Sequence, residues 1–344
     1  MDVDTQHLRT FVGVATAGSF SAAARELGYT QSAVSQQVAA LEADLGVVLF
    51  HRRPTVAVTE AGARLLEHAV PLLLRLAAAR TEVARAAGTP SQRLTIAAHP
   101  LAADRLAEVL ARVTPTFPRL ELRVVLGGTP MVATEVARGD VDLGIAVGLA
   151  TSGDPLRLPD VGPIRAVGIA EEPPAVILPT GHPLAGRPGV RIADLVDAGW
   201  IDAPELGAGL DHLRGLTSER RLRARMRVDG ADVQGLLALV AAGGGLALLP
   251  ARIVHPGHDG QAGPSAHPDQ GRAGRGDLVA VPVRGGVLAT RGSGAHPARA
   301  AASTIRGTRA PGDAALNFRH ELLSAGRPGP AAQAVAVALG AGPG

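Results

Sequence analysis

The sequence predicts a mixed α/β protein in three parts: a mainly helical winged helix-turn-helix at the N-terminus, a long linker helix, and a two-lobed α/β domain. Three patterns support this prediction. Short apolar stripes with helical spacing, separated by Gly, occupy residues 8–45, and a heptad of apolar residues follows. From residue 93 onward, strand-like and helix-like segments alternate. A chain of 344 residues has room for two domains and a connecting element.

The composition excludes several kinds of chemistry. All 34 basic side chains are Arg, since the chain contains no Lys, so it has neither a Walker A lysine nor a Schiff-base lysine. Cys is also absent, which excludes disulfides, thiolate metal sites and a cysteine nucleophile. The N-terminus lacks a signal-peptide pattern, and the best apolar run, 236–251, is too short to span a membrane. We therefore expect a cytoplasmic protein.

The first 45 residues predict three short helices. Their apolar stripes are Leu8, Phe11, Val12 and Ala15; Phe20, Ala23, Ala24 and Leu27; and Val34, Val38, Leu41 and Leu45. Gly18 and Gly28 suit the left-handed residue that ends a helix, while Ser19 or Ser21, and then Thr30, suit the N-caps of the next two helices. Two helices joined by a short turn containing Gly are the signature of a helix-turn-helix.

The polar face of the third helix is suited to reading DNA bases. Its side chains are short hydrogen-bonding groups: Gln31, Ser32, Ser35 and Gln36, with Ala39 beside them. Gln can pair with adenine, Ser with several bases, and Ala can contact a thymine methyl group. Residues 1–88 contain eight Arg and eight acidic residues. The prediction of DNA binding therefore depends on the placement of these groups and not on net charge.

A wing is predicted directly after the third helix. Val56 and Val58 alternate with smaller or polar residues, as in a short strand, and Arg52, Arg53 and Pro54 form the tip of the preceding turn. Guanidinium groups on a turn beside a recognition helix can contact phosphates or the minor groove. On the pattern alone, a small α-helical domain with no role in DNA binding is the alternative.

The stretch from Leu8 to Gly62 resembles the N-terminal domain of the LysR-type transcriptional regulators. The resemblance is carried by LRTFVGVATAGSFSAAARELGYTQSAVSQQVAALEADLGVVLFHRR and by TEAG. Further matches are ILPTGHPLAGR at 177–187, WIDAP at 200–204 and DVQGLLALVAAGGGLALLP at 232–250. The resemblance extends over about residues 3–255.

This resemblance implies a DNA-binding domain over residues 1–60. The residues it places at base edges, at nearby phosphates or on the wing are Gln31, Ser32, Ala33, Ser35, Gln36, Arg52 and Arg53. Members of the family act as homodimers or homotetramers on inverted repeats in double-stranded DNA, so that the protein's two-fold axis sets the half-site spacing.

A linker and dimerisation helix is predicted over residues 61–89, with Thr59 as its cap. Its apolar residues follow a heptad: Leu65, Ala69, Leu72, Leu76, Ala79, Val83 and Ala86. We expect Leu65, Leu72, Leu76 and Val83 to contact a second copy. The alternative is a long helix packed on its own domain, but a helix of about 28 residues extends ~40 Å and is too long for that cover alone.

Residues 90–306 are predicted to form an α/β effector-binding domain. One lobe would combine 90–162 with 276–306, and the other would comprise 163–255. The segments LTIAA, LELRVVL and VDLGIAV read as strands with helices between them, which indicates a parallel sheet. By resemblance this is the effector-binding domain of the family, similar to periplasmic solute-binding proteins.

The predicted effector site lies where the strands of this domain end, because open α/β sheets bind ligands beyond the carboxyl ends of their strands. The residues expected there are His99, Leu101, Gly128, Thr129 and Val147, with Trp200 and Asp202 facing them from the other lobe. The family often has Ser or Thr at the position of His99. An ordinary strand-end histidine is the alternative role for His99, and a core position is the alternative for Trp200.

No metal and no cofactor are predicted. His255, His258 and Asp259 lie close in sequence but lack a fourth ligand. The arginines at 220–227 read as a solvated helix end and strand edge, or else as a contact for an anionic effector or a subunit.

The C-terminal quarter of the chain is expected to be largely irregular. Gly and Pro make up about 29% of residues 256–344. We expect a flexible insertion at 256–275, a returning strand near 276–283, a final helix near 296–306 and a disordered tail at 307–344.

Taken together, these patterns predict a sequence-specific transcription regulator controlled by a small-molecule effector. The alternatives are an architectural DNA-binding protein without an effector and an enzyme that uses the α/β cleft. The sequence contains no G-x-S-x-G or H-E-x-x-H motif, so we do not expect an enzyme.

Overall fold

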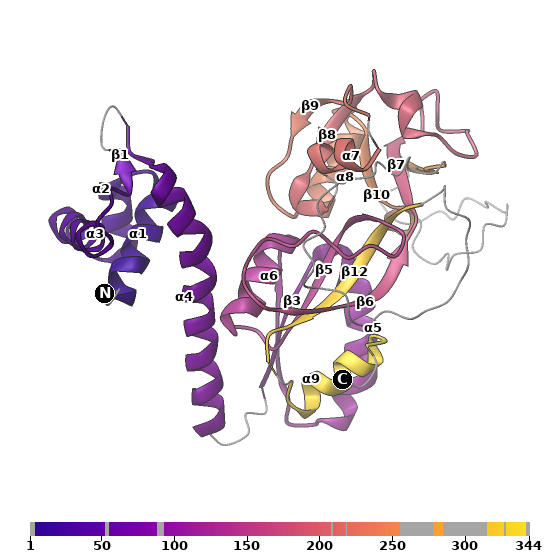
Figure 1. The fold of residues 1–344 in the computed structure, drawn as a ribbon. Helices are drawn as coiled ribbons and strands as arrows, with labels where there is room; N and C mark the ends of the chain where they lie inside the picture. Colours follow the sequence, from indigo (N-terminus) through magenta and orange to yellow (C-terminus); the bar gives the residue numbers. More distant parts are fainter. Residues whose placement is uncertain are drawn as a thin grey trace. The chain divides into compact units, whose positions relative to one another are not determined.

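A computed structural model of the chain describes residues 4–51, 55–87, 93–207, 209–217, 219–254, 278–284, 315–326 and 328–341. The chain divides into two compact units, one built on the N-terminal helices and the other on most of the residues after 92 (Figure 1). Among the described residues, no helix has the length and apolar character needed to cross a membrane.

Local capping explains where the first three helices begin and end. They are α1 (Thr5–Ala17), α2 (Phe20–Leu27) and α3 (Gln31–Leu45). Ser19 and Thr30, as predicted, accept hydrogen bonds from the first turns of α2 and α3. Gly18 and Gly28 end α1 and α2 with φ angles of 62° and 71°, a conformation that glycine adopts without strain. The predicted helix-turn-helix is confirmed.

The core of the first unit joins these helices to a short hairpin. Strands β1 (Phe50–His51) and β2 (Ala57–Val58) pair antiparallel. The Phe50 ring lies 5.3 Å from that of Phe11 and 5.6 Å from that of Phe20, measured between centroids, so the hairpin is packed against α1 and α2.

Helix α4 (Glu60–Ala87) follows the hairpin as one continuous helix that contains Pro71. The Thr59 hydroxyl accepts a hydrogen bond from the backbone N–H of Gly62 at 3.0 Å, so Thr59 caps the helix as predicted.

The second unit contains a five-stranded sheet with the order β4-β3-β5-β12-β6. The first three of its strands in sequence form the predicted βαβαβ arrangement, and they pair in parallel. The elements of that arrangement are β3 (Arg93–Ala98), α5 (Ala103–Val113), β4 (Glu121–Leu126), α6 (Thr129–Arg138) and β5 (Leu143–Thr151). Strand β6 (Arg165–Glu172), which the sequence analysis did not predict, closes the other edge.

The second lobe contains two smaller sheets. Strand β7 (Pro174–Pro179) pairs antiparallel with β10 (Ala247–Pro250) on one side and β11 (Leu278–Pro282) on the other. Strands β8 (Gly199–Asp202) and β9 (Arg223–Arg227) pair in parallel. The helices of this lobe are α7 (Leu210–Thr217) and α8 (Val233–Ala241). We predicted that the 276–283 strand belongs to the first lobe, which is wrong, because β11 pairs with β7.

The predicted disordered tail at 307–344 is also wrong for the residues of it that the structure describes, 315–326 and 328–341. Strand β12 (Leu316–Ser324) lies between β5 and β6, antiparallel to both, and helix α9 (Pro330–Ala338) packs against α5 (Figure 1). The predicted insertion at 256–275 and the final helix at 296–306 lie outside the described residues.

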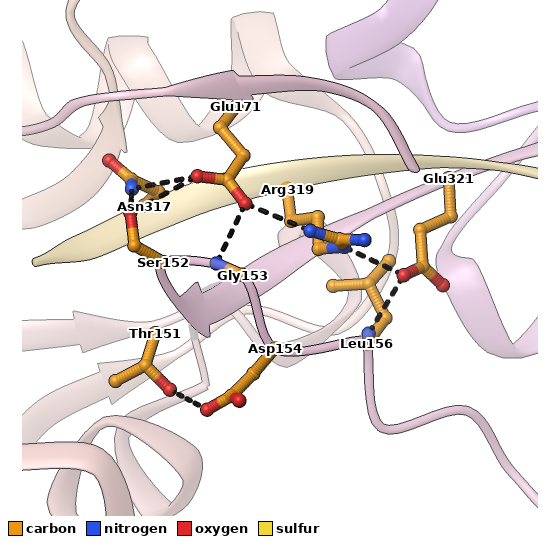
Figure 2. Close-up of polar contacts among 9 residues, drawn as sticks. All are labelled: Thr151, Ser152, Gly153, Asp154, Leu156, Glu171, Asn317, Arg319 and Glu321. Carbon is orange, nitrogen blue, oxygen red and sulfur yellow. Dashed lines mark hydrogen bonds and ion pairs between the residues drawn. The ribbon is translucent and has the colours of Figure 1, made fainter. Parts of the chain in front are cut away.

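Charged and polar side chains form hydrogen bonds between β12 and the neighbouring segments, as Figure 2 shows. Arg319 donates to Glu171 of β6 at 2.8 Å and to Glu321 on its own strand at 2.7 Å. Glu321, only 2% exposed, also accepts from the backbone N–H of Leu156 at 3.1 Å. Asn317 donates to Ser152 and to Glu171. These hydrogen bonds and ion pairs compensate the charged side chains of β12, which is an interior strand of the sheet.

Candidate functional site

The predicted DNA-reading face of α3 is open to solvent. Gln31, Ser32 and Gln36 are exposed, and Ala33 and Ser35 are half-buried. The opposite side of the helix carries Val34, Val38 and Leu41, all fully buried in the core of the first unit. Because the buried residues fix the rotation of α3, the short polar side chains face outward together.

Hydrogen bonds to the rest of the unit hold α3 in place. Thr10 of α1, itself buried, donates to the side chain of Gln37 at 2.5 Å. Near the other end, the Glu42 carboxylate accepts from the backbone N–H groups of Leu49 and Phe50 at 2.8 and 3.4 Å. These hydrogen bonds connect α3 to α1 and to the start of the hairpin. The predicted wing residues Arg52 and Arg53 lie outside the described residues.

The apolar stripe of α4 is only partly covered by its own unit. Leu65 packs against the core of the first unit, whereas the side chains of Leu72 and Val83 are 58% and 69% exposed. Leu76 is half-buried.

The predicted effector site is covered by the chain itself. His99 is fully buried, and its Nδ1 atom accepts from the backbone N–H of Leu101 at 3.1 Å. Its Nε2 atom therefore carries the proton and donates to the backbone oxygen of Glu205, 3.0 Å away in the second lobe. Both ring nitrogens are used in structural contacts, so the strand-end role weighed for His99 is the one observed.

The neighbouring strand ends are covered in the same way. The Thr129 hydroxyl donates to the backbone oxygen of Val147 at 2.7 Å and accepts from its N–H at 3.0 Å. The backbone oxygen of Gly207 accepts from Leu149, and His212 in turn donates to the backbone oxygen of Leu149 at 2.8 Å. We name the described residues 203–207 and 209–212 the interlobe segment. It occupies the place where the strand-end rule predicted the effector.

Trp200 and Asp202 support the fold of the second lobe. Trp200 is fully buried and donates from Nε1 to the backbone oxygen of Leu195 at 3.0 Å, which makes it a core residue. Asp202 accepts from the backbone N–H of Leu210 at 2.9 Å, at the start of α7.

A cavity of about 680 Å³ lies beside the interlobe segment, between the starts of three helices. Gly128 alone among the seven predicted effector residues lines it. Its other lining residues include four with polar side chains, namely Asp104, Glu205, Asp232 and Gln234. They also include the apolar residues Pro100, Leu126, Met131 and Ile253. The volume is in the range of small-molecule sites.

The acidic residues of this cavity, Asp104, Glu205 and Asp232, were not among the predicted site residues. Two of them carried a detectable signal: Asp232 is the N-cap of α8, and Asp104 lies in the first turn of α5. Glu205 carried no comparable signal, because its position depends on the packing of the interlobe segment against Gly128.

A partly buried cluster of charged side chains borders the cavity. Arg252 donates to Glu172 and to the backbone oxygen of Leu101, and it lies 3.5 Å from Asp104. His320, fully buried, has its Nε2 atom 3.0 Å from the Glu172 carboxylate. Burial acts to raise the pKa of Glu172, but the hydrogen bonds and charges of His320 and Arg252 outweigh it and lower that pKa below its usual value.

Acid is expected to destabilise the second unit through His99. Burial lowers the pKa of His99 to about 4, an effect strengthened by the nearby His320 and opposed by the hydrogen bond to Glu205. Between pH 6.5 and 4 the unfolded chain binds a proton that the folded chain excludes. The contribution of His99 to the free energy of unfolding should therefore fall by about 3 kcal/mol over this interval and stay level above it. The lowered pKa of Glu172 removes further stability below about pH 4.5.

Denaturant unfolding of the full chain from pH 7 to pH 4 measures this dependence. His99→Gln keeps a donor near Glu205 but does not titrate, so its stability should change less between pH 6.5 and 4. His182→Gln, at a half-buried turn in the second lobe, serves as the control and should keep the parent's pH dependence. Identical pH profiles for His99→Gln and the parent would show that His99 is not the group responsible.

Within the described part of the chain, no group of three or more His, Asp or Glu side chains could hold a metal ion.

Two family models match the chain. Residues 5–63 match the bacterial regulatory helix-turn-helix protein, lysR family, and residues 87–268 match the LysR substrate binding domain. The first match contains the helix-turn-helix and the hairpin. The second covers about half of the chain and contains the cavity and the interlobe segment.

Similar curated proteins are named as a regulatory protein, a gene activator and a transcriptional regulator. The small neutral protease regulatory protein of Streptomyces coelicolor is 32% identical over 247 residues, which cover 71% of this chain and 72% of that protein. A probable hydrogen peroxide-inducible genes activator of Mycobacterium avium is 32% identical over 72% of this chain and 78% of its own length. The uncharacterized HTH-type transcriptional regulator YnfL of Escherichia coli is 28% identical over 73% of this chain and 83% of its own length.

Solved structures give a similar but weaker match. A Corynebacterium glutamicum OxyR C206 mutant is 23% identical, with a TM-score of 0.46, and the match covers 99% of this chain and 93% of that chain. Full-length CbnR in complex with its target DNA is 20% identical, with a TM-score of 0.43 and coverage of 98% of both chains.

Proposed function

The chain belongs to the LysR family of DNA-binding transcriptional regulators, with an effector-binding domain, and we propose that α3 reads its operator and that the cavity beside the interlobe segment binds its effector. It is a regulator and not an enzyme. The observation that supports the proposal is that one chain has two features: an outward polar face on α3, which is hydrogen-bonded to α1 and to the hairpin, and a partly polar cavity between the lobes of the second unit.

The proposed DNA contacts lie on α3 and on the wing. Gln31, Ser32, Ala33, Ser35 and Gln36 share the outer side of the helix, where the major groove would admit them. Arg52 and Arg53 are proposed to contact the backbone or the minor groove beside it. A regulator that acts on chromosomal DNA works in the cytoplasm of a bacterium, and we propose that location.

The proposed assembly is a homodimer or homotetramer joined through α4. Leu65 packs against the core of its own unit. Beyond it, the heptad continues through Leu72 and Val83, which are exposed, and Leu76, which is half-buried. Pairing with a second α4 would cover them and would place two recognition helices on one inverted repeat. Leu65 is proposed to contribute to the same subunit contact, at the end of this stripe nearer the core of the first unit.

The proposed effector site is the cavity and not the strand ends covered by the interlobe segment. Glu205 supports this assignment because it takes part in both regions: its backbone oxygen accepts from His99, and the residue lines the cavity. A ligand that contacts Glu205 would therefore shift the relative stability of two lobe arrangements, which is the requirement for an effector response.

Fluorescence anisotropy tests the proposed function most directly. The full chain is titrated with DNA from upstream of its own gene and with scrambled DNA at the same salt concentration. We expect a preference for the upstream DNA of about 10³ or more. Equal affinity for both would contradict sequence-specific binding at that site.

Gln36→Ala is expected to weaken operator binding by about 1–3 kcal/mol and to relax preference at one base position, because it removes a base-reading amide without disturbing the buried side of α3. Arg53→Ala should instead weaken all sequences alike and reduce the salt dependence, as expected for a phosphate contact. Anisotropy with single-base operator variants distinguishes the two. If Gln36→Ala discriminates among them as the parent does, α3 does not read bases through Gln36.

A further inference from the structure

The charged side chains that line the proposed effector cavity have a single sign. Asp104, Glu205 and Asp232 line it, and among the described residues of that lining there is no Arg or His. The three acids come from three separate elements: α5, the interlobe segment and the start of α8. Local sequence therefore does not account for their convergence on one cavity.

Helix N-termini at the cavity would ordinarily favour an anion, but each already has an acidic residue beside it. Helices α5, α6 and α8 all begin at the cavity, and each N-terminus has a partial positive charge of about half a unit. Asp104 lies in the first turn of α5, and Asp232 caps α8 by accepting from the N–H of Gln234 at 3.0 Å. Glu205 packs against Gly128, the residue before α6, where an added Cβ would lie 3.0 Å from the Glu205 backbone oxygen. These acidic residues therefore offset the preference of the helix starts for an anion.

The nearby guanidinium does not neutralise this set. Arg252 makes its shorter contacts with Glu172 and the backbone oxygen of Leu101, and it reaches only Asp104 among the cavity acids, at 3.5 Å. Within the described residues, the carboxylates of Glu205 and Asp232 have no ion pair with a basic side chain. They are the two lining charges that a ligand could neutralise.

The rest of the lining is apolar. Leu126, Met131 and Ile253 line the same cavity, and Pro100 lies beside them. These side chains can cover a short hydrocarbon body while the carboxylates hold a charged end. The lining thus combines two charge-accepting groups with apolar contact area.

We propose that the effector is an organic cation, a small molecule with a primary ammonium or guanidinium group on a short hydrocarbon body. The charged group pairs with Glu205 and Asp232, and the body contacts Leu126, Met131 and Ile253. This inference rests on the proposed function, in which the cavity is the effector site. Because Glu205 also accepts from His99 through its backbone, neutralising its carboxylate acts on the residue that joins the two lobes.

The test measures binding of defined probes to the full-length protein by isothermal titration calorimetry. The cationic probes are 1,4-diaminobutane and 4-guanidinobutylamine, and the matched controls of equal carbon length are the neutral 1,4-butanediol and the dianion succinate. We expect the cations to bind, and the diol and succinate to give no signal up to about 10 mM.

Two variants remove charge while preserving the local structure. Asp232→Asn keeps a side chain that caps helices as well as Asp does, and Glu205→Gln leaves the backbone bond to His99 in place. Each should weaken the cation by about tenfold or more, as expected for the loss of a charged hydrogen-bond partner. Asp197→Asn, an exposed residue paired with Arg221, is the control and should bind the cations like the parent.

The outcomes separate this inference from the proposed function. If succinate or the diol binds and the cations do not, the effector class is wrong; weakened binding of that ligand in Met131→Ala would still support the cavity as the effector site. If the cations bind equally well to Asp232→Asn, Glu205→Gln and the parent, they bind elsewhere and the inference is overturned. Absence of cation binding also overturns the inference. Operator affinity measured on the same sample tests the proposed DNA-binding function independently of the effector.

Discussion

Deleting the chain from residue 315 onward is expected to unfold the second unit. The deletion removes β12, which pairs with β5 through residues 316–323 and with β6 through residues 318–324. It also removes Phe318, His320 and Leu323, which are all fully buried. The loss of an interior strand with its core side chains exceeds the total stability of a typical domain, about 5–15 kcal/mol. Soluble yield and the thermal unfolding transition of the second unit are the measurements.

Two point variants on β12 test the contribution of its core packing to stability without shortening the chain. Phe318→Ala should cost about 3–5 kcal/mol, because it opens a cavity in the core. Asn317→Ala, at the adjacent residue, removes only solvent-exposed hydrogen bonds to Ser152 and Glu171 and should cost about 1 kcal/mol or less. A truncated chain that unfolds at the parent's temperature would show that β12 is not part of the sheet.

The error in the sequence analysis at 307–344 has a physical cause. The high Gly and Pro content of the surrounding region predicts disorder, and LNFRHELLS contains Arg, His and Glu, which are unusual in an interior strand. Arg319 and His320 are compensated by Glu171 and Glu172, which lie far away in sequence, on β6, and Glu321 is compensated by Arg319 and by the backbone N–H of Leu156. Sequence patterns detect local periodicity and caps, but they do not show which distant charge will lie opposite.

The contrast between local signals and long-range contacts also explains which parts of the site could be predicted. The helix-turn-helix follows from short-range signals, namely the apolar stripes of α1 to α3 and the caps at Ser19 and Thr30. The strand-end rule points to the edge of the sheet at which the cavity lies, but it could not show that the interlobe segment covers His99. The acidic lining of the cavity depends on the same long-range packing, so only the structure shows it.

Gly62→Ala is the substitution expected to disrupt the DNA-binding unit most. Gly62 is buried in the first turn of α4, and a Cβ at this position would overlap the backbone oxygen of Leu49. That oxygen accepts from the N–H of Thr59 at 2.9 Å, so it cannot move away without breaking the bond that joins the hairpin to α4. Overpacking against backbone costs more than the ~1–3 kcal/mol typical of side-chain crowding, and we expect about 3 kcal/mol or more.

Gly13→Ala provides the matched control, because it makes the same chemical change inside a helix of the same unit. A Cβ at Gly13 would lie 3.0 Å from Cδ1 of Leu27, the flexible end of a side chain that can rotate. There, the gain in helix propensity of ~0.5–1 kcal/mol offsets the crowding, so stability should change little. Calorimetric unfolding and operator affinity measured on both variants should show both lowered for Gly62→Ala and nearly unchanged for Gly13→Ala. Equal effects would mean that the approach of Leu49 to α4 does not constrain position 62, and that the joint between wing and linker helix is looser than this contact implies.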